Sequence, residues 1–156
     1  MKNFINTLLA AGNVTLANSF DGAPVPQIRR PWEVGCRITI PKDYQVCMQE
    51  MPAGNRLFFV PVLVQFPDGD TIMDKFFTST LFKSVRTSDN QYLRTRGSVV
   101  DKVRHYPNLD EAFKYGLAGR TFEITVDTLC EVRDPRMDCY RPTHIYQFDF
   151  VYPLAA

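Results

Sequence analysis

The residues best suited to chemistry in this chain are its two histidines and four cysteines. His105 and His144 have no nucleophile at a recognisable spacing, so nucleophilic or general-base catalysis has no evident centre. Cys130, Cys139 and His144 follow a C-x8-C-x4-H spacing, which matches no established zinc pattern. Neither glycine-rich phosphate loop, G-x-x-x-x-G-K-[ST] or G-x-G-x-x-G, occurs. We therefore expect a protein that is not an enzyme and that uses no metal or cofactor.

Arginine offers a different chemistry, because its guanidinium group can hold a phosphate backbone. Residues 84–107 carry five basic residues against two aspartates, which makes this the most basic stretch of the chain. The candidate nucleic-acid contacts in this stretch are Arg86, Arg94, Arg96 and Arg104. A solvated loop with scattered charge is the simpler alternative, and the sequence alone favours it.

A second group of basic and aromatic residues lies in residues 131–144. Arginine and tyrosine together offer a charge and a stacking plane, and each stacked base can contribute roughly 1–3 kcal/mol. The candidates here are Arg133, Arg136, Tyr140 and Arg141. Because Glu131, Asp134 and Asp138 balance the arginines, salt bridges within a hairpin loop are an equally good interpretation.

Three further residues complete the set of candidate binding residues. Trp32 is the only tryptophan and lies close to Arg30, although a structural role at the end of a barrel is the favoured interpretation for so large an aromatic side chain. Lys75 and Phe77, together with Phe58, are candidates for the outer face of a central hairpin. Aromatic residues on strands are more often part of the core.

Composition describes a globular chain whose basic character is local. The 156 residues are 45% hydrophobic and 13% aromatic, with a formal net charge of +1. This balance argues against a histone-like protein, whose whole surface attracts nucleic acid. The cysteines lack paired spacing and no apolar run reaches the length of a membrane span. We therefore expect reduced thiols, a cytoplasmic location and no membrane association.

Alternating apolar residues predict strands that position these side chains. Five strands are expected, at residues 36–48 with a bend at Pro41, at 57–66, at 71–78, at 121–129 and from Tyr146 to Tyr152. The Pro67-Asp68-Gly69 turn should join the second and third strands as an antiparallel hairpin. In the fourth strand Phe122, Ile124 and Val126 are expected to share the buried side. Residues 84–98 read as a long loop.

One helix is expected between the third and fourth strands. Asn108 is a good N-cap, and Glu111 follows at the spacing of a capping box. Leu109, Phe113 and Leu117 share one apolar face. Residues 4–11 favour another short helix, whereas residues 18–35 hold too many prolines and glycines for a regular element.

Three strands, a helix and two strands is the element order of an OB-fold, a small five-stranded barrel. We therefore predict a mainly β protein, with an OB-fold-like barrel over residues 36–156 and an N-terminal short helix and proline-rich arm over residues 1–35. A β-sandwich and an α+β sheet are the alternatives.

This architecture leads to two functional hypotheses. The first is non-catalytic binding of single-stranded DNA, with RNA as the alternative, in a basic groove lined by aromatic residues. The second is a structural subunit of an assembly such as a virion, in which residues 21–35 and 84–107 contact neighbouring proteins. A homo-oligomer is compatible with both.

Overall fold

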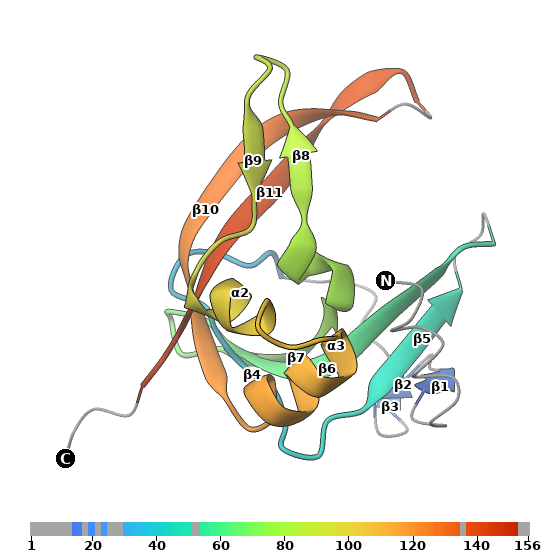
Figure 1. Ribbon diagram of the computed structural model, residues 1–156, viewed down its shortest axis with the longest axis vertical. Helices are drawn as coiled ribbons and strands as arrows, with labels where there is room; N and C mark the ends of the chain where they lie inside the picture. Colours follow the sequence, from blue (N-terminus) through green and yellow to red (C-terminus); the bar gives the residue numbers. More distant parts are fainter. Residues whose placement is uncertain are drawn as a thin grey trace.

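The computed structural model describes residues 30–50, 54–134 and 137–152, together with the backbone of three short N-terminal strands (Figure 1). These strands are β1 (Val14–Leu16), β2 (Ser19–Phe20) and β3 (Ala23–Pro24). β2 and β3 form a two-residue antiparallel pair, so the proline-rich segment does contain regular pairing. The helix expected over residues 4–11 lies outside the described residues.

The protein is mainly β, and one antiparallel sheet forms its body. Its strands are β4 (Arg37–Thr39), β5 (Val46–Glu50), β6 (Arg56–Gln65), β7 (Thr71–Phe77), β10 (Thr121–Asp134) and β11 (Cys139–Phe150). The pairing order runs β7-β6-β4-β10-β11, and β1 adds a parallel partner to β5.

Two strands pair with the same edge of β6. Ile38 of β4 is registered with Val64, and Met48 of β5 is registered with Phe58 near the other end of β6. β4 and β5 are therefore two parts of one curved strand that is interrupted around Pro41. The predicted bent strand is confirmed, and the interruption allows the sheet to curl around the core.

The hairpin of β6 and β7 is also confirmed. Gly69 adopts a φ of 92°, which a glycine reaches without steric cost, and Phe66 and Asp70 are joined by a backbone hydrogen bond of 2.8 Å. Val62 lies opposite Asp74 in the ladder. The turn at Gly69 therefore sets the register of the β6–β7 ladder.

The sheet does not close into a barrel, so the predicted closed barrel is wrong. Within the described residues no ladder joins the two edge strands β7 and β11. The chain at Arg96 instead forms a parallel bridge to Gln147 of β11. Trp32 fills part of the gap, with its ring centroid 6.0 Å from that of Phe76 on β7 and 5.9 Å from that of Tyr146 on β11.

The core lies between the sheet and a layer of short helices (Figure 1). Phe76, Phe122 and Phe148 meet edge to face at its centre, with ring centroids 5.5 to 5.8 Å apart. The covering helices are α2 (Ser98–Val103), α3 (Leu109–Glu111) and the π-helical η2 (Ala112–Leu117). These edge-to-face contacts join β7, β10 and β11 and stabilise the core by more than the burial of apolar area alone.

The helix expected after the third strand is confirmed as α3 and its π-helical continuation η2. The Asn108 side chain accepts a hydrogen bond of 2.9 Å from the Glu111 amide. Leu109, Phe113 and Leu117 are buried, as the amphipathic pattern predicted. A second helix, α2, was not predicted.

The segment expected as a loop before that helix is ordered. It contains the strands β8 (Ser84–Arg86) and β9 (Tyr92–Arg94), with the 3-10 helix η1 (Thr78–Phe82) before it and the start of α2 at its end. Asn90 supplies the hairpin turn with a φ of 66°. The loop expected over residues 131–144 is mostly ladder as well, since Asp134 and Cys139 are still paired.

Two hairpins therefore project together from the body (Figure 1). We call β8, β9 and the adjoining ends of β10 and β11 the hairpin lobe. Thr87 forms a β-bridge with Val132, and the Ser88 amide donates a hydrogen bond of 3.2 Å to the Glu131 carbonyl. The lobe is thus held together by backbone contacts.

A bulge in β10 changes which side chains face the core. The register with β11 shifts between Ile124 and Val126. From Val126 onward, each side chain of β10 therefore faces the side opposite to the one that unbroken alternation predicts. Val126 is consequently 46% exposed, and the expectation that it shares the buried side with Phe122 and Ile124 is wrong.

Candidate nucleic-acid interface

The solvent-facing side of the β8–β9 hairpin brings two predicted arginines together. The register places Arg86 opposite Tyr92, and Ser84 opposite Arg94. Because alternate residues of a strand share one side, these four side chains lie on the same face, and all four residues are exposed. We call this surface the hairpin face. Tyr92, which the sequence analysis did not single out, lies between the two arginines.

The hairpin face is positively charged. Within the described residues, neither Arg86 nor Arg94 forms an ion pair with a carboxylate. The Arg86 guanidinium donates a hydrogen bond of 3.1 Å to the Asn90 side chain, which is neutral. The Ser84 hydroxyl is hydrogen-bonded to the Tyr92 hydroxyl and so orients the ring of Tyr92, a residue that is 62% exposed.

The tip of the β10–β11 hairpin is electrically balanced. Arg133 is paired with Asp138, and the Nε of Arg141 lies 3.4 Å from the Oδ2 of Asp134. The salt bridges that were the alternative interpretation are therefore present. Tyr140 is 55% exposed beside them. Arg136 lies outside the described residues.

The remaining predicted arginines lie on other elements. Arg96 is exposed, and its backbone pairs with Gln147 at the edge of β11. Arg104 forms the C-terminal end of α2, where a cation complements the helix dipole. The structure therefore gathers Arg86 and Arg94 but not Arg104.

A pocket of ≈ 390 Å³ lies along the gap between β7 and β11. We call it the seam pocket. The His144 and Tyr146 rings stack on its β11 side, with centroids 5.8 Å apart and planes inclined by 6°. The Nδ1 of His144 lies 2.8 Å from a carboxylate oxygen of Asp127. Partial desolvation lowers the pKa of Lys83, which also lines the pocket.

Lys75 and Phe77 lie on the outer face of the sheet, the face opposite the helices, as the sequence predicts. That part of the face is not open to solvent, because Lys75 is only 8% exposed and Phe59 is fully buried. The Lys75 ammonium donates a hydrogen bond of 2.6 Å to the Gln49 side chain and lies 5.0 Å from the Phe59 ring centroid. Phe58 belongs to the core, so its placement on the outer face is wrong.

The side chains considered for a metal site do not converge. Cys130 is registered with Thr143, and His144 with Leu129, so Cys130 and His144 point to opposite sides of the hairpin. Within the described residues no three histidine, cysteine or acidic side chains form a group that could hold a metal ion. None of the four cysteines forms a disulfide bond.

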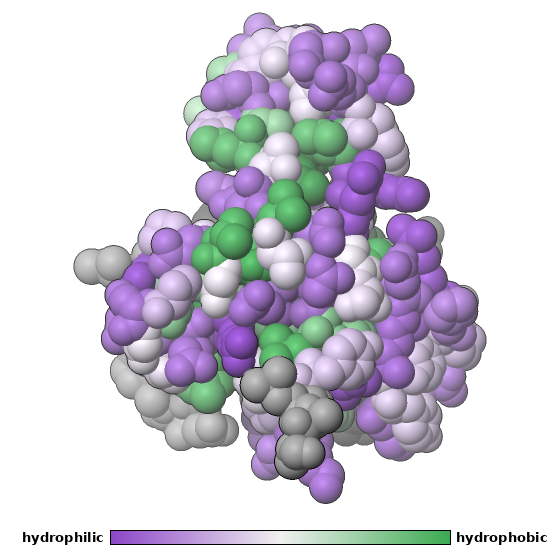
Figure 2. Space-filling model, turned by 90° about the vertical axis from the view of Figure 1, so that its left-hand side faces the viewer, coloured by the Kyte–Doolittle hydropathy of each residue, from purple (hydrophilic) through white to green (hydrophobic). Residues whose placement is uncertain are grey.

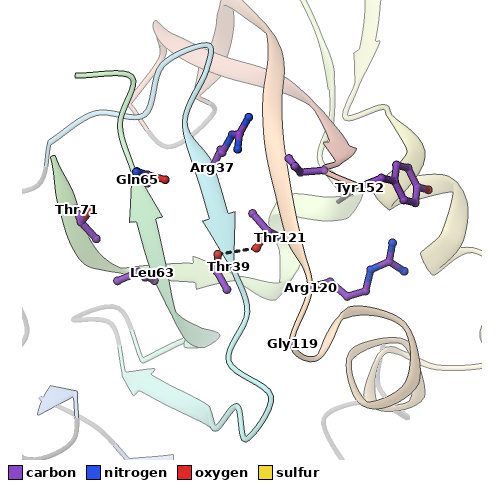
Figure 3. Close-up of a pocket in the computed structure, with 10 residues that line it drawn as sticks. Arg37, Thr39, Leu63, Gln65, Thr71, Gly119, Arg120, Thr121 and Tyr152 are labelled. Carbon is purple, nitrogen blue, oxygen red and sulfur yellow. Dashed lines mark hydrogen bonds between the residues drawn. The ribbon is translucent and has the colours of Figure 1, made fainter. Parts of the chain in front are cut away.

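A larger pocket, of ≈ 640 Å³, lies on the outer face of β4, β6, β7 and β10 (Figure 3). We call it the outer-face pocket. Its lining includes Arg120 and Tyr152, which sequence reasoning missed because neither belongs to a basic cluster. Arg37, also in the lining, is paired with Glu123 at 3.2 Å.

Apolar side chains are interspersed with polar ones over the hairpin lobe and the body below it (Figure 2). On β10, Val126 and Leu129 are 46% and 61% exposed. In the part of the chain that the structure describes, no helix is both long and apolar enough to cross a membrane.

Comparison with protein-family profiles, curated proteins and solved structures finds no significant match to this chain.

Proposed function

We propose that this protein binds single-stranded DNA without catalysing a reaction, through the hairpin face. The observation that carries the proposal is the arrangement of Arg86, Tyr92 and Arg94, which are all exposed, lie on one side of a hairpin and have no described carboxylate to neutralise them. Guanidinium groups bind phosphates, and an exposed tyrosine ring can stack on a base.

The proposal favours a single strand because of Tyr92. In a duplex the faces of the bases are covered by their neighbours, whereas a single strand can offer a base to the ring. The low net charge of the chain agrees with this, since a few local contacts suffice for such binding. RNA offers the same phosphates and base faces and is the alternative ligand.

The arrangement of the sheet supports the same proposal. We propose that the body is an OB-fold whose barrel is left partly open, because its curved first strand pairs with both the second and the fourth strand. The loop between the fourth and fifth strands of that fold commonly grips oligonucleotides. Here that loop ends the β10–β11 hairpin, to which the β8–β9 hairpin is bridged.

Titration of a labelled oligo-dT, followed by fluorescence anisotropy, tests the proposal. We expect micromolar or tighter binding at low salt. The two phosphate contacts of the hairpin face should contribute about −1.4 to the slope of log K against log salt, which by itself is about a sevenfold loss of affinity between about 50 and about 200 mM salt. Absence of binding to both oligo-dT and an RNA oligonucleotide at low salt would overturn the proposal.

Variants of the hairpin face locate the site. The double change Arg86→Ala and Arg94→Ala should weaken binding and remove most of the salt dependence. Tyr92→Ala should cost about 1–3 kcal/mol of binding free energy. The matched control is Arg56→Ala, which removes an exposed arginine near Glu50 on a different strand and should leave affinity unchanged. If the hairpin variants bind like wild type, the strand binds elsewhere.

A second candidate function is assembly with other proteins. The observation that favours it is the 61% exposure of Leu129 on β10, because a large exposed apolar side chain on a long strand offers a contact for a partner. A mass measurement in solution tests this candidate. A closed oligomer that loses subunits on Leu129→Lys would support it, and a monomer at all concentrations would exclude self-assembly.

A further inference from the structure

We infer that the outer-face pocket binds one nucleotide unit, with its phosphate at Arg120 and its base against Tyr152. This inference deepens the proposed function and rests on it insofar as the nucleotide belongs to a DNA strand. A free mononucleotide has the same chemistry, and binding experiments with a mononucleotide and with an oligonucleotide distinguish the two sources.

The pocket is built from strands that the core holds in place. Arg37, Thr39, Leu63 and Thr121 alternate with core residues, which turns them to the outer face. Figure 3 shows Arg120 and Tyr152 on one side of the Thr39–Thr121 pair, with Leu63, Gln65 and Thr71 on the other. The two threonine hydroxyls are 2.8 Å apart and form the polar centre of the pocket.

Arg120 is prepared to bind an anion. Its guanidinium carbon lies 3.9 Å from the Phe150 ring centroid, so the cation is held over an aromatic face. A cation–π contact does not use the N–H donors of the guanidinium group, so these stay available. Within the described residues, the Arg120 side chain makes no hydrogen bond and no ion pair. A half-buried cation with free donors is a good phosphate ligand.

The backbone holds Arg120 at a fixed place. Gly119, with a φ of 73°, ends the helical segment, and its amide donates a hydrogen bond of 2.9 Å to the Ile40 carbonyl. The Arg120 amide donates one of 3.0 Å to the Leu117 carbonyl. Arg120 thus lies in an anchored turn directly before β10, and ligand binding need not order the backbone.

Tyr152 supplies a stacking surface beside the phosphate position. Tyr152 is 66% exposed, and its ring centroid lies 5.7 Å from the Arg120 guanidinium carbon. One ligand can therefore contact both side chains, as a nucleotide does when its phosphate and base bind neighbouring groups.

The rest of the lining restricts the class of ligand. Because Arg37 is neutralised by Glu123, Arg120 is the one lining cation without a described acidic partner. Threonine hydroxyls and the Gln65 amide suit the polar atoms of a sugar or base, and Leu63 adds an apolar wall. The volume of ≈ 640 Å³ greatly exceeds what an inorganic anion fills, so a nucleotide satisfies the site better.

Calorimetric titration of the full chain with dTMP, and anisotropy with labelled oligo-dT, test the inference. Arg120→Gln removes the charge and should weaken the binding of at least one of these probes tenfold or more. For the oligonucleotide it should also reduce the salt slope by about 0.7, which corresponds to one phosphate. Tyr152→Ala truncates a side chain that is mostly exposed, and it should weaken the same probe severalfold. Arg56→Gln is the control that should change neither.

The outcomes separate this inference from the proposed function. Oligonucleotide binding that depends on Arg120 without dTMP binding assigns the pocket to the strand. Binding of dTMP that depends on Arg120, without any oligonucleotide binding, supports the pocket as a mononucleotide site and overturns the proposed function. If both variants bind the oligonucleotide like wild type and dTMP does not bind, the inference is overturned and the proposed function stands. A thermal unfolding curve of Arg120→Gln shows whether a loss of binding is caused by misfolding. If it is, the affinity of Tyr152→Ala decides whether the ligand binds in the pocket.

Discussion

The indole Nε1 of Trp32 donates a hydrogen bond of 2.8 Å to the Oδ2 of Asp74. This contact ties the chain before the sheet to the inner face of the edge strand β7. The same indole stacks on Phe76 at an interplanar angle of 15° and contacts Tyr146 of β11. Trp32 therefore bridges the two edge strands with a side chain, at the place where a closed barrel would use a ladder.

Replacing Trp32 with phenylalanine should lower the free energy of unfolding by about 1–3 kcal/mol, because the buried Asp74 carboxylate loses a donor. Urea denaturation measures the change. In an Asp74→Asn background the same replacement should cost less, since the charged partner is already absent. Equal costs in both backgrounds would show that the lost ring area, and not the hydrogen bond, accounts for the effect.

Gly97→Ala should destabilise the protein far more than Gly69→Ala. Both glycines have positive φ values, 114° and 92°, so both replacements carry a backbone cost of about 1–3 kcal/mol. Only at Gly97 would the added methyl group meet backbone, at 2.0 Å from the Phe148 carbonyl oxygen, whereas nothing lies within 4 Å at Gly69. Thermal unfolding of the two variants compares them, and similar melting temperatures would contradict the close packing of the α2 start against β11.

Asp149 should make stability depend on pH in the acid range. Burial raises the pKa of its carboxyl, but hydrogen bonds from Gln147, Ser98 and Thr125 outweigh burial and hold the pKa below its ordinary value. A carboxyl with a lowered pKa stabilises the folded state above its unfolded pKa of about 4, and this contribution is lost as pH falls through the folded pKa.

The comparison of wild type with Asp149→Asn tests this dependence. The wild type should be more stable at neutral pH, and the difference should shrink below about pH 4. Urea denaturation at several pH values gives the two curves. Asp43→Asn, at an exposed loop position, is the control. A difference that is constant with pH would contradict the prediction.

Tyr44 and Tyr146 should make stability fall in the alkaline range. Burial, the larger cause, and nearby carboxylates raise the pKa of each to about 12. Since the raised value favours the neutral phenol in the folded state, this contribution is complete below the unfolded pKa of about 10 and is lost as pH rises towards 12. Tyr146→Phe should therefore flatten the stability curve above about pH 10. Denaturation curves of wild type and variant that run parallel there would contradict the prediction.

Local signals predicted the elements whose cause is local. The Asn108 cap, the turn at Gly69 and the bend near Pro41 each depend on a few neighbouring residues, and the structure has all three. The hairpin of β8 and β9 was missed, because its short strands gain stability only from the bridge to Val132 and the rest of the lobe.

The candidate site shows the same division. The sequence by itself determined the residue types, the basic character of residues 84–107 and a strand-rich fold, because these follow from composition and short-range alternation. Only the tertiary structure decided that Tyr92 lies opposite Arg86, that Arg133 and Arg141 are neutralised, and that Arg120 packs on Phe150 with free donors. Strand register and long-range packing fix these contacts, and a change of one residue in register, as the bulge before Val126 shows, turns a side chain to the other face of the sheet.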